Sequence, residues 1–124
     1  MRHHESIMQI SCVKWFRYQY PDYAKLLVHI PNGGSRDLRT AQRLKAEGVI
    51  SGVPDLMLTI PSHPHHALFV ELKVKPNRQS ATQKEWQGLV EAKGYAYKLV
   101  YSFDEFQQVI QEYIGNIGSH SQTP

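Results

Sequence analysis

The chain has 124 residues, of which 41% are hydrophobic and 20% charged, and its formal net charge is +3 at pH 7. This size and composition fit one soluble globular domain, and no apolar run reaches the roughly 18–20 residues of a membrane-spanning helix. The single cysteine, Cys12, excludes an internal disulfide and a cysteine-rich zinc module, and it predicts a reducing, cytoplasmic compartment. The mildly basic charge permits a phosphate-bearing partner without identifying one.

The first third of the chain predicts a helix followed by a short strand. A helical pattern runs from residue 4 to about residue 20 and ends before Pro21. Glu5 lies in the middle of its apolar face, which is unusual for a charged residue. Residues 25–30 then predict a strand that ends at a Pro-Asn-Gly-Gly turn. The apolar face of the helix contains five residues: Met8, Cys12, Val13, Trp15 and Phe16.

A second helix is expected from Ser35, as N-cap, to about residue 47. Its two sides differ in chemistry, because Leu38 and Ala41 lie opposite a row of arginines and are expected to face the core. The row of arginines consists of Arg36, Arg39 and Arg43.

The remaining sequence predicts a β-hairpin and then alternating helices and strands. Residues 55–60 and 67–74 form the hairpin around a loop rich in proline and histidine, and a helix capped by Ser80 runs to about residue 93. A strand over 95–101 should run parallel to the second hairpin strand by a right-handed crossover. Ser102 and Glu105 predict a capping box for a last helix to about residue 114. The expected fold is α/β, with a central mixed sheet flanked by helices in one domain (1–114) and a mobile tail (115–124).

The hairpin brings acidic residues together. Pairing about a loop centred near residue 63 places Asp55 opposite Glu71, and side-chain alternation directs Glu71 and Lys73 to one face. Burying two anions in an otherwise apolar hairpin costs several kcal/mol unless a cation compensates, and oxygen ligands of this kind suit Mg²⁺ or Mn²⁺. The alternative is a plain salt bridge between Lys73 and one acid on a solvated sheet face.

Three motifs together point to a family: Gly52-Val53-Pro54-Asp55, Glu71-Leu72-Lys73, and Gln83 in the next helix. The sequence resembles the PD-(D/E)XK nuclease superfamily, and within it the VRR-NUC branch with its small stand-alone bacteriophage members. The resemblance covers about residues 5–114. It implies a restriction-endonuclease-like core and a metal-dependent DNA endonuclease, often selective for DNA structure. Small members are similar to Holliday-junction resolvases and act as homodimers, which for a phage protein would work in the bacterial cytoplasm.

The resemblance also assigns roles to the metal centre. Asp55 and Glu71 would ligate one or two Mg²⁺ or Mn²⁺ ions, with the backbone carbonyl of Leu72 as a further ligand. Lys73 would orient or help to deprotonate the attacking water and balance charge at the phosphate. In-line attack on phosphorus by a water that the metal activates is the expected chemistry.

Two further residues, Glu5 and Gln83, have both a catalytic and a structural interpretation. Glu5 matches the acidic residue on the first helix of the family, although acids in a first helical turn also interact favourably with the helix dipole. Gln83 would contact the nucleophile or phosphate, although it also completes a capping box with Ser80.

The expected DNA contacts are polar and basic side chains on either side of these motifs. Guanidinium and ammonium groups bind phosphates, although the alternatives are ordinary turn chemistry and a solvated helix face. The candidates are Asn32, Arg36, Arg39, Arg43, Lys75, Arg78 and Lys84. No metal site is expected in the histidine-rich loop, and no special role for His29. A DNA-binding module whose nuclease site has lapsed is the alternative function.

Overall fold

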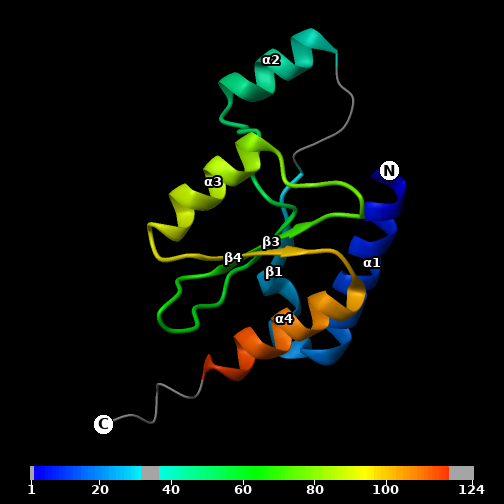
Figure 1. Cartoon of the computed structure of the whole chain (residues 1–124), viewed down its shortest axis with the longest axis vertical. Coiled ribbons are helices and arrows are strands. Elements are labelled where there is room, and N and C mark those ends of the chain that lie inside the picture. Colours follow the sequence, from blue (N-terminus) through cyan, green and yellow to red (C-terminus); the bar gives the residue numbers. More distant parts are fainter. Residues whose placement is uncertain (1, 32–36, 118–124) are drawn as a thin grey trace.

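The computed structural model describes residues 2–31 and 37–117 (Figure 1). Helices and strands alternate along most of the chain, and a 3₁₀ helix joins the first helix to the first strand. The elements are α1 (Arg2–Gln19), the 3₁₀ helix (Pro21–Leu26), β1 (Leu27–His29), α2 (Leu38–Ala46), β2 (Leu56–Leu58), β3 (Leu68–Leu72), α3 (Ala81–Glu91), β4 (Ala96–Val100) and α4 (Phe103–Gly115).

The four strands form one mixed sheet in the order β1-β2-β3-β4. Strand β2 pairs antiparallel with both β1 and β3, whereas β3 and β4 are parallel. Leu56 lies opposite Val70, and continuing this register by one residue brings position 55 opposite position 71. The hairpin, its register and the parallel crossover strand predicted from the sequence are therefore confirmed, as is the α/β fold with a mixed sheet.

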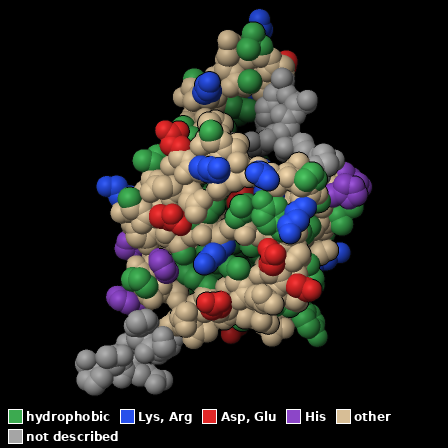
Figure 2. Space-filling model, in the orientation of Figure 1, with side chains coloured by type: hydrophobic (Ala, Val, Ile, Leu, Met, Phe, Trp, Pro, Cys, Tyr) green, Lys and Arg blue, Asp and Glu red, His purple; other side chains and the backbone are tan. Residues whose placement is uncertain are grey.

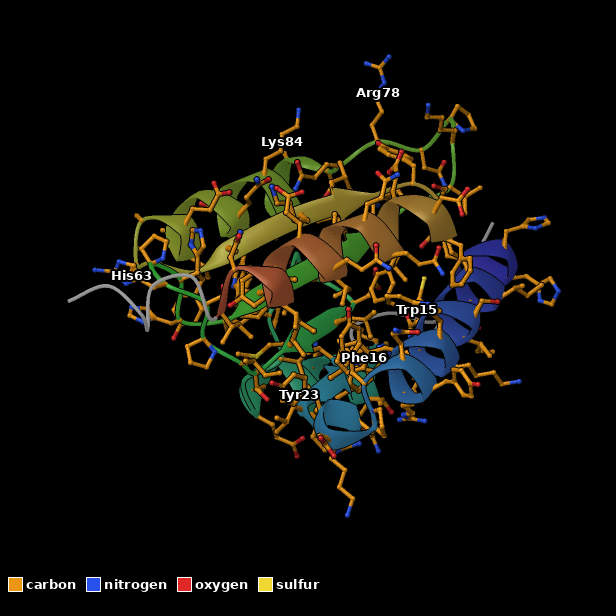
Figure 3. All side chains as sticks on the ribbon, turned by 90° about the horizontal axis from the view of Figure 1, so that it is seen from below. Trp15, Phe16, Tyr23, His63, Arg78 and Lys84 are labelled. Carbon is orange, nitrogen blue, oxygen red and sulfur yellow. The ribbon has the colours of Figure 1, made fainter. Side chains whose placement is uncertain are left out.

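The two faces of the sheet are covered by different helices. Helices α1 and α4 lie together on one face and α3 lies on the other (Figures 1 and 3). The main core lies between the sheet and the α1–α4 pair, where Phe16 and Phe106 are fully buried and Trp15 contacts Phe106 edge to face. On the opposite face, Phe69 packs edge to face against Trp86 of α3. The apolar side predicted for the first helix is thus the side that contacts this core.

The helix starts after β3 and β4 follow the predicted capping chemistry. The Ser80 hydroxyl accepts a hydrogen bond from the Gln83 N–H, and the Gln83 side chain in turn accepts one from the Ser80 N–H. The Ser102 hydroxyl accepts from the Glu105 N–H, but the Glu105 carboxylate accepts from Tyr101 N–H, one residue earlier than in a regular capping box. Each cap satisfies N–H groups that a helix start leaves without an intrahelical partner.

Two expectations for the first half of the chain are wrong. Residues 25 and 26 belong to the 3₁₀ helix, so the strand is limited to Leu27–His29. Helix α2 begins at Leu38 and its N-cap is Asp37, whose carboxylate accepts a hydrogen bond from the Thr40 N–H at 2.7 Å. Ser35, the predicted cap, lies outside the described residues.

Helix α2 also lacks the core contact expected for Leu38 and Ala41. Leu38 is 73% exposed, Ala41 is exposed, and no residue of α2 is buried. Figure 1 shows the reason, because α2 extends away from the sheet whose faces are covered by the other three helices. Leu38 and Ala41 therefore face solvent and not the core.

The C-terminal part of the described chain continues slightly past α4. The helix ends at Gly115, and Ile117 packs against the core cluster. Residues 118–124 of the predicted tail lie outside the described residues. No helix in the described ranges is long and apolar enough to cross a membrane.

Candidate active site

Asp55 is held from both neighbouring strands. It directly precedes β2, and its backbone carbonyl accepts a hydrogen bond from the Ile30 N–H at 2.8 Å. Its carboxylate Oδ2 accepts a hydrogen bond from the Leu72 N–H at 2.8 Å, at the end of β3. The side chain of Asp55 is therefore directed towards the strand that contains Glu71.

Glu71 is an ionisable residue buried in β3. Its residue surface is only 4% exposed, and Lys73 Nζ lies 3.9 Å from Oε2. Oε2 also accepts a hydrogen bond from Gln83 Nε2 at 2.9 Å. The other oxygen, Oε1, is buried and has no hydrogen-bond partner within the described part of the chain. A buried acceptor left without a partner is costly, and such atoms are rare in folded proteins.

Gln83 uses both ends of its amide. Its Oε1 accepts from the Ser80 N–H at 2.8 Å, while its Nε2 donates to Glu71. The two interpretations of this residue are therefore compatible, because the capping contact fixes the amide in the orientation that presents its N–H group to the carboxylate. Helix α3 in this way supplies a fixed hydrogen-bond donor to the acidic pair.

Gly52 allows the segment before Asp55 to lie against the start of α3. Its φ of +94° is in the region that favours glycine, and a Cβ built there would lie 2.6 Å from the Thr82 carbonyl oxygen. Any side chain at residue 52 would collide with backbone. The glycine thus brings the segment that contains Asp55 close to the helical turn that contains Gln83.

Burial and nearby negative charge shift both acids towards the neutral form. Burial, followed by the charge of Asp55, raises the pKa of Glu71 to about 8, against the opposing effect of Lys73. Burial also raises the pKa of Asp55, which the Leu72 N–H opposes and the charge of Glu5 reinforces. Both carboxyl groups thus have raised pKa values. A bound cation would favour their ionised forms, so this pair indicates a candidate cation site.

A cleft of about 390 Å³ adjoins Asp55 and extends to the N-terminal turns of α1. Glu5, half-buried on α1, lines this cleft together with Asp55, which supports the inward orientation expected for it. The full lining is His3, Glu5, Ser6, Gln9, His29 and Asp55.

His29 is a residue whose contact the sequence reasoning missed. Its Nδ1 lies 2.9 Å from the Asp55 carbonyl oxygen, whereas we expected no special role for it. The sequence reasoning lacked the pairing of β1 with β2, which places His29 opposite Leu56 and therefore beside Asp55.

The donor set fits a hard divalent cation. Two carboxylates approach one another at the ends of β2 and β3, and one of their oxygens is buried without a partner among the residues described. No group of three or more His, Cys, Asp or Glu side chains that could hold an ion occurs within residues 2–31 and 37–117. A bound ion would therefore need oxygen ligands beyond side chains, which is usual for Mg²⁺.

The candidate DNA contacts are spread over several elements. Arg39 and Arg43 are exposed on α2, where Arg43 forms an ion pair with Glu47 at 3.2 Å. Lys75 Nζ lies 5.7 Å from the centre of the Tyr101 ring. Asn32 and Arg36 lie outside the described residues.

Two exposed basic residues, Arg78 and Lys84, extend in a common direction. Arg78, after β3, and Lys84, on α3, both point into solvent on the same side of the molecule (Figure 3). Lys and Arg side chains also gather over the start of α3 and over α2 in Figure 2. His63 in the histidine-rich loop lies far from α1 (Figure 3).

Comparisons with known proteins identify the family of the chain. A solved structure described as a VRR_NUC domain protein superimposes with a TM-score of 0.79 at 26% identity, covering 90% of this chain and 88% of the other. The comparison with curated proteins finds no match. The VRR-NUC domain family model matches residues 3–104, which cover α1 from its second residue and every later element through β4. The chain therefore belongs to the VRR-NUC family of nucleases.

Proposed function

We propose that this protein is a Mg²⁺- or Mn²⁺-dependent endonuclease that hydrolyses phosphodiester bonds in DNA. The observation that carries the proposal is the buried Oε1 of Glu71, which lacks a hydrogen-bond partner among the described residues. Leaving such an acceptor unsatisfied costs about 1–3 kcal/mol, and more when it is charged. A cation shared with Asp55 would remove this cost and stabilise the ionised form of both carboxyl groups, whose pKa values burial raises.

The metal would be held by the carboxylates of Asp55 and Glu71 and by the backbone carbonyl of Leu72. When bound, the ion supplies Lewis-acid stabilisation of the charge that develops at phosphorus, and it acidifies a coordinated water. Asp55 is prepared for this task by the Leu72 N–H, which fixes one carboxylate oxygen. Gln83 does the same for Oε2 of Glu71, so Oε1 remains available.

Other side chains would act on the water and the phosphate. Water attacks phosphorus in line with the sugar oxygen that leaves, so a new P–O bond forms as the old one breaks. Lys73 would orient or help to deprotonate this water, or bind a phosphate oxygen, from its half-buried position beside Glu71. Glu5 would accept hydrogen bonds from water in the cleft beside Asp55.

DNA would approach along the side from which Arg78 and Lys84 project. Lys75 and the exposed arginines of α2, Arg39 and Arg43, would contact phosphates further along the backbone. Contacts of this kind provide affinity without reading sequence, which suits an enzyme that recognises the shape of its substrate.

The test is cleavage of labelled linear and branched DNA in Mn²⁺ or Mg²⁺. We expect Asp55→Asn, Glu71→Gln and Lys73→Ala to lose more than about 100-fold in rate, because even outer-shell partners of a metal are worth 10–100-fold. All three variants should still bind DNA, since phosphate contacts elsewhere provide most of the affinity. Wild-type cleavage no faster than that of the variants would instead identify a DNA-binding module with a lapsed site.

We also propose that the enzyme acts as a homodimer on branched DNA such as a Holliday junction. A single small domain offers little surface for such a substrate, and cutting two strands requires two sites. Faster cleavage of four-way junctions than of plain duplex is expected. Light scattering should give twice the monomer mass, and a monomer at working concentrations would contradict the dimer.

A further inference from the structure

The carbonyl oxygen of Asp55 accepts two hydrogen bonds from β1 and the residue after it. The Ile30 N–H donates to it at 2.8 Å, and Nδ1 of His29 lies 2.9 Å from the same oxygen. A carbonyl oxygen has two lone pairs and no proton, so it can only accept. The His29 contact therefore requires the proton to be on Nδ1.

Asp55 is therefore held both at its backbone carbonyl and at its side-chain carboxylate. The Asp55 carboxylate is fixed by the Leu72 N–H of β3, and its carbonyl by β1. The ladder between β1 and β2 comprises only three residue pairs, and Asp55 lies just outside it. Apart from the Ile30 N–H, no ladder hydrogen bond from β1 therefore holds the backbone of Asp55 among the described residues. The imidazole adds a second bond where the ladder ends.

We propose that His29 is a positioning residue of the active site, which holds the backbone of Asp55 through its Nδ1–H group so that the carboxylate is directed at the cation. This inference rests on the proposed function, since it assigns a role toward the proposed metal. His29 acts here through Asp55 and is not placed in contact with the reacting atoms. Its exposed position means that its removal leaves the core packing intact.

Three substitutions of His29 distinguish the role of Nδ1 from that of Nε2. In His29→Asn, the amide N–H can occupy the place of Nδ1–H and keep the bond to Asp55. In His29→Gln, the amide reaches the place of Nε2 and the bond is lost, and His29→Ala removes both. His63→Asn is the matched control, because His63 is exposed in the loop far from α1 (Figure 3).

The main readout is Mn²⁺ affinity, measured by titration calorimetry, with the melting temperature of the metal-free protein measured alongside. We expect His29→Ala and His29→Gln to bind Mn²⁺ about tenfold more weakly, as for other outer-shell partners of a metal. His29→Asn and His63→Asn should bind Mn²⁺ like the wild type, and the melting temperatures should show that every variant is folded. Equal affinity in every variant would overturn the proposal, and so would an equal loss in all three His29 variants.

A second readout needs no metal. Nitrogen-15 correlation spectra of the imidazole rings, recorded above neutral pH, should show His29 as the Nδ1–H tautomer in the wild-type protein. The Nε2–H tautomer would refute the assigned bond. If the wild type bound no Mn²⁺, the proposed metal centre would fail while this spectrum still decided whether His29 holds Asp55.

Discussion

The two faces of strand β3 are equally buried but differ in chemistry. Leu68, Val70 and Leu72 lie in the apolar cluster on the α1–α4 side, where contacts among hydrocarbon side chains satisfy them. On the other side, towards α3, Phe69 is followed by Glu71, which has one carboxylate oxygen without a partner among the described residues. One face thus stabilises the fold, while the other retains an energetic cost.

This contrast indicates why burial alone is a poor guide to the role of a residue. Removing an apolar group from a packed face leaves a cavity, so the fold loses free energy. Removing the ionisable group of Glu71 should leave the fold intact or more stable, because burial disfavours its charged form. A buried polar group that costs stability is expected at sites that serve function.

The largest expected effect on stability is on the apolar face. Leu68→Ala should lower the free energy of unfolding by about 2–5 kcal/mol, because the fully buried side chain would leave a cavity in the core. Urea unfolding at one pH measures this loss. A loss of less than about 1 kcal/mol would mean that this face is not the densely packed one.

The acidic face should respond to pH in the metal-free protein. Glu71 keeps its proton up to a pKa of about 8 when folded but loses it near its ordinary value of 4.5 when unfolded. Between these values the folded state binds more protons, so the free energy of unfolding should fall as pH rises. Glu71→Gln should flatten this dependence in unfolding experiments at pH of about 5 and about 8. An unchanged dependence would assign it to other groups.

Substitutions of Gln83 and Ser80 should distinguish the helix cap from the hydrogen bond that Gln83 donates to Glu71. Gln83→Ala removes the N–H that fixes Glu71 and should weaken Mn²⁺ binding about tenfold in titration calorimetry. Ser80→Ala removes the cap but leaves that contact, so it should cost about 1 kcal/mol of stability with unchanged affinity for Mn²⁺. Equal affinities in the two variants would show that Gln83 acts only as a cap.

The smallest effects are expected at the exposed basic residues. Arg78→Ala and Lys84→Ala should each lower the salt dependence of DNA binding by about one in the log–log slope, because each loses a phosphate contact. Lys25→Ala is the control, because Lys25 is an exposed residue of the 3₁₀ helix, whose Tyr23 lies on the side of the molecule opposite Arg78 and Lys84 (Figure 3). Fluorescence anisotropy at several salt concentrations measures the slopes, and an equal decrease in the control would contradict a directed DNA path.

The sequence predicted best those features that depend on neighbours in the chain. The hairpin register follows from the loop centre, so the approach of Asp55 to Glu71 could be deduced without a structure. The Ser80–Gln83 cap is likewise a local pattern, and the parallel strand follows from the strand–helix–strand order, which is typical of a helical crossover.

The features that the sequence did not predict depend on distant elements. The apolar side of α2 is visible in the sequence, but whether any element remains to cover Leu38 depends on how three other helices fill the sheet faces. The bond from His29 to Asp55 joins residues 26 positions apart and needs the β1–β2 register. The start of α2 was misplaced because Ser35 and Asp37 both have side chains suited to capping.

The missing side chain at Gly52 limits how this nuclease domain can be re-engineered. A single methyl group at residue 52 would press on the Thr82 carbonyl, and the hairpin and α3 would have to separate to relieve that pressure. This movement would lengthen the hydrogen bond between Glu71 and the amide of Gln83. A substitution of Gly52, which is not itself a proposed catalytic residue, would therefore disturb the geometry of the active site. A graft of the hairpin onto another scaffold therefore has to include this glycine and the first turn of α3 as one unit.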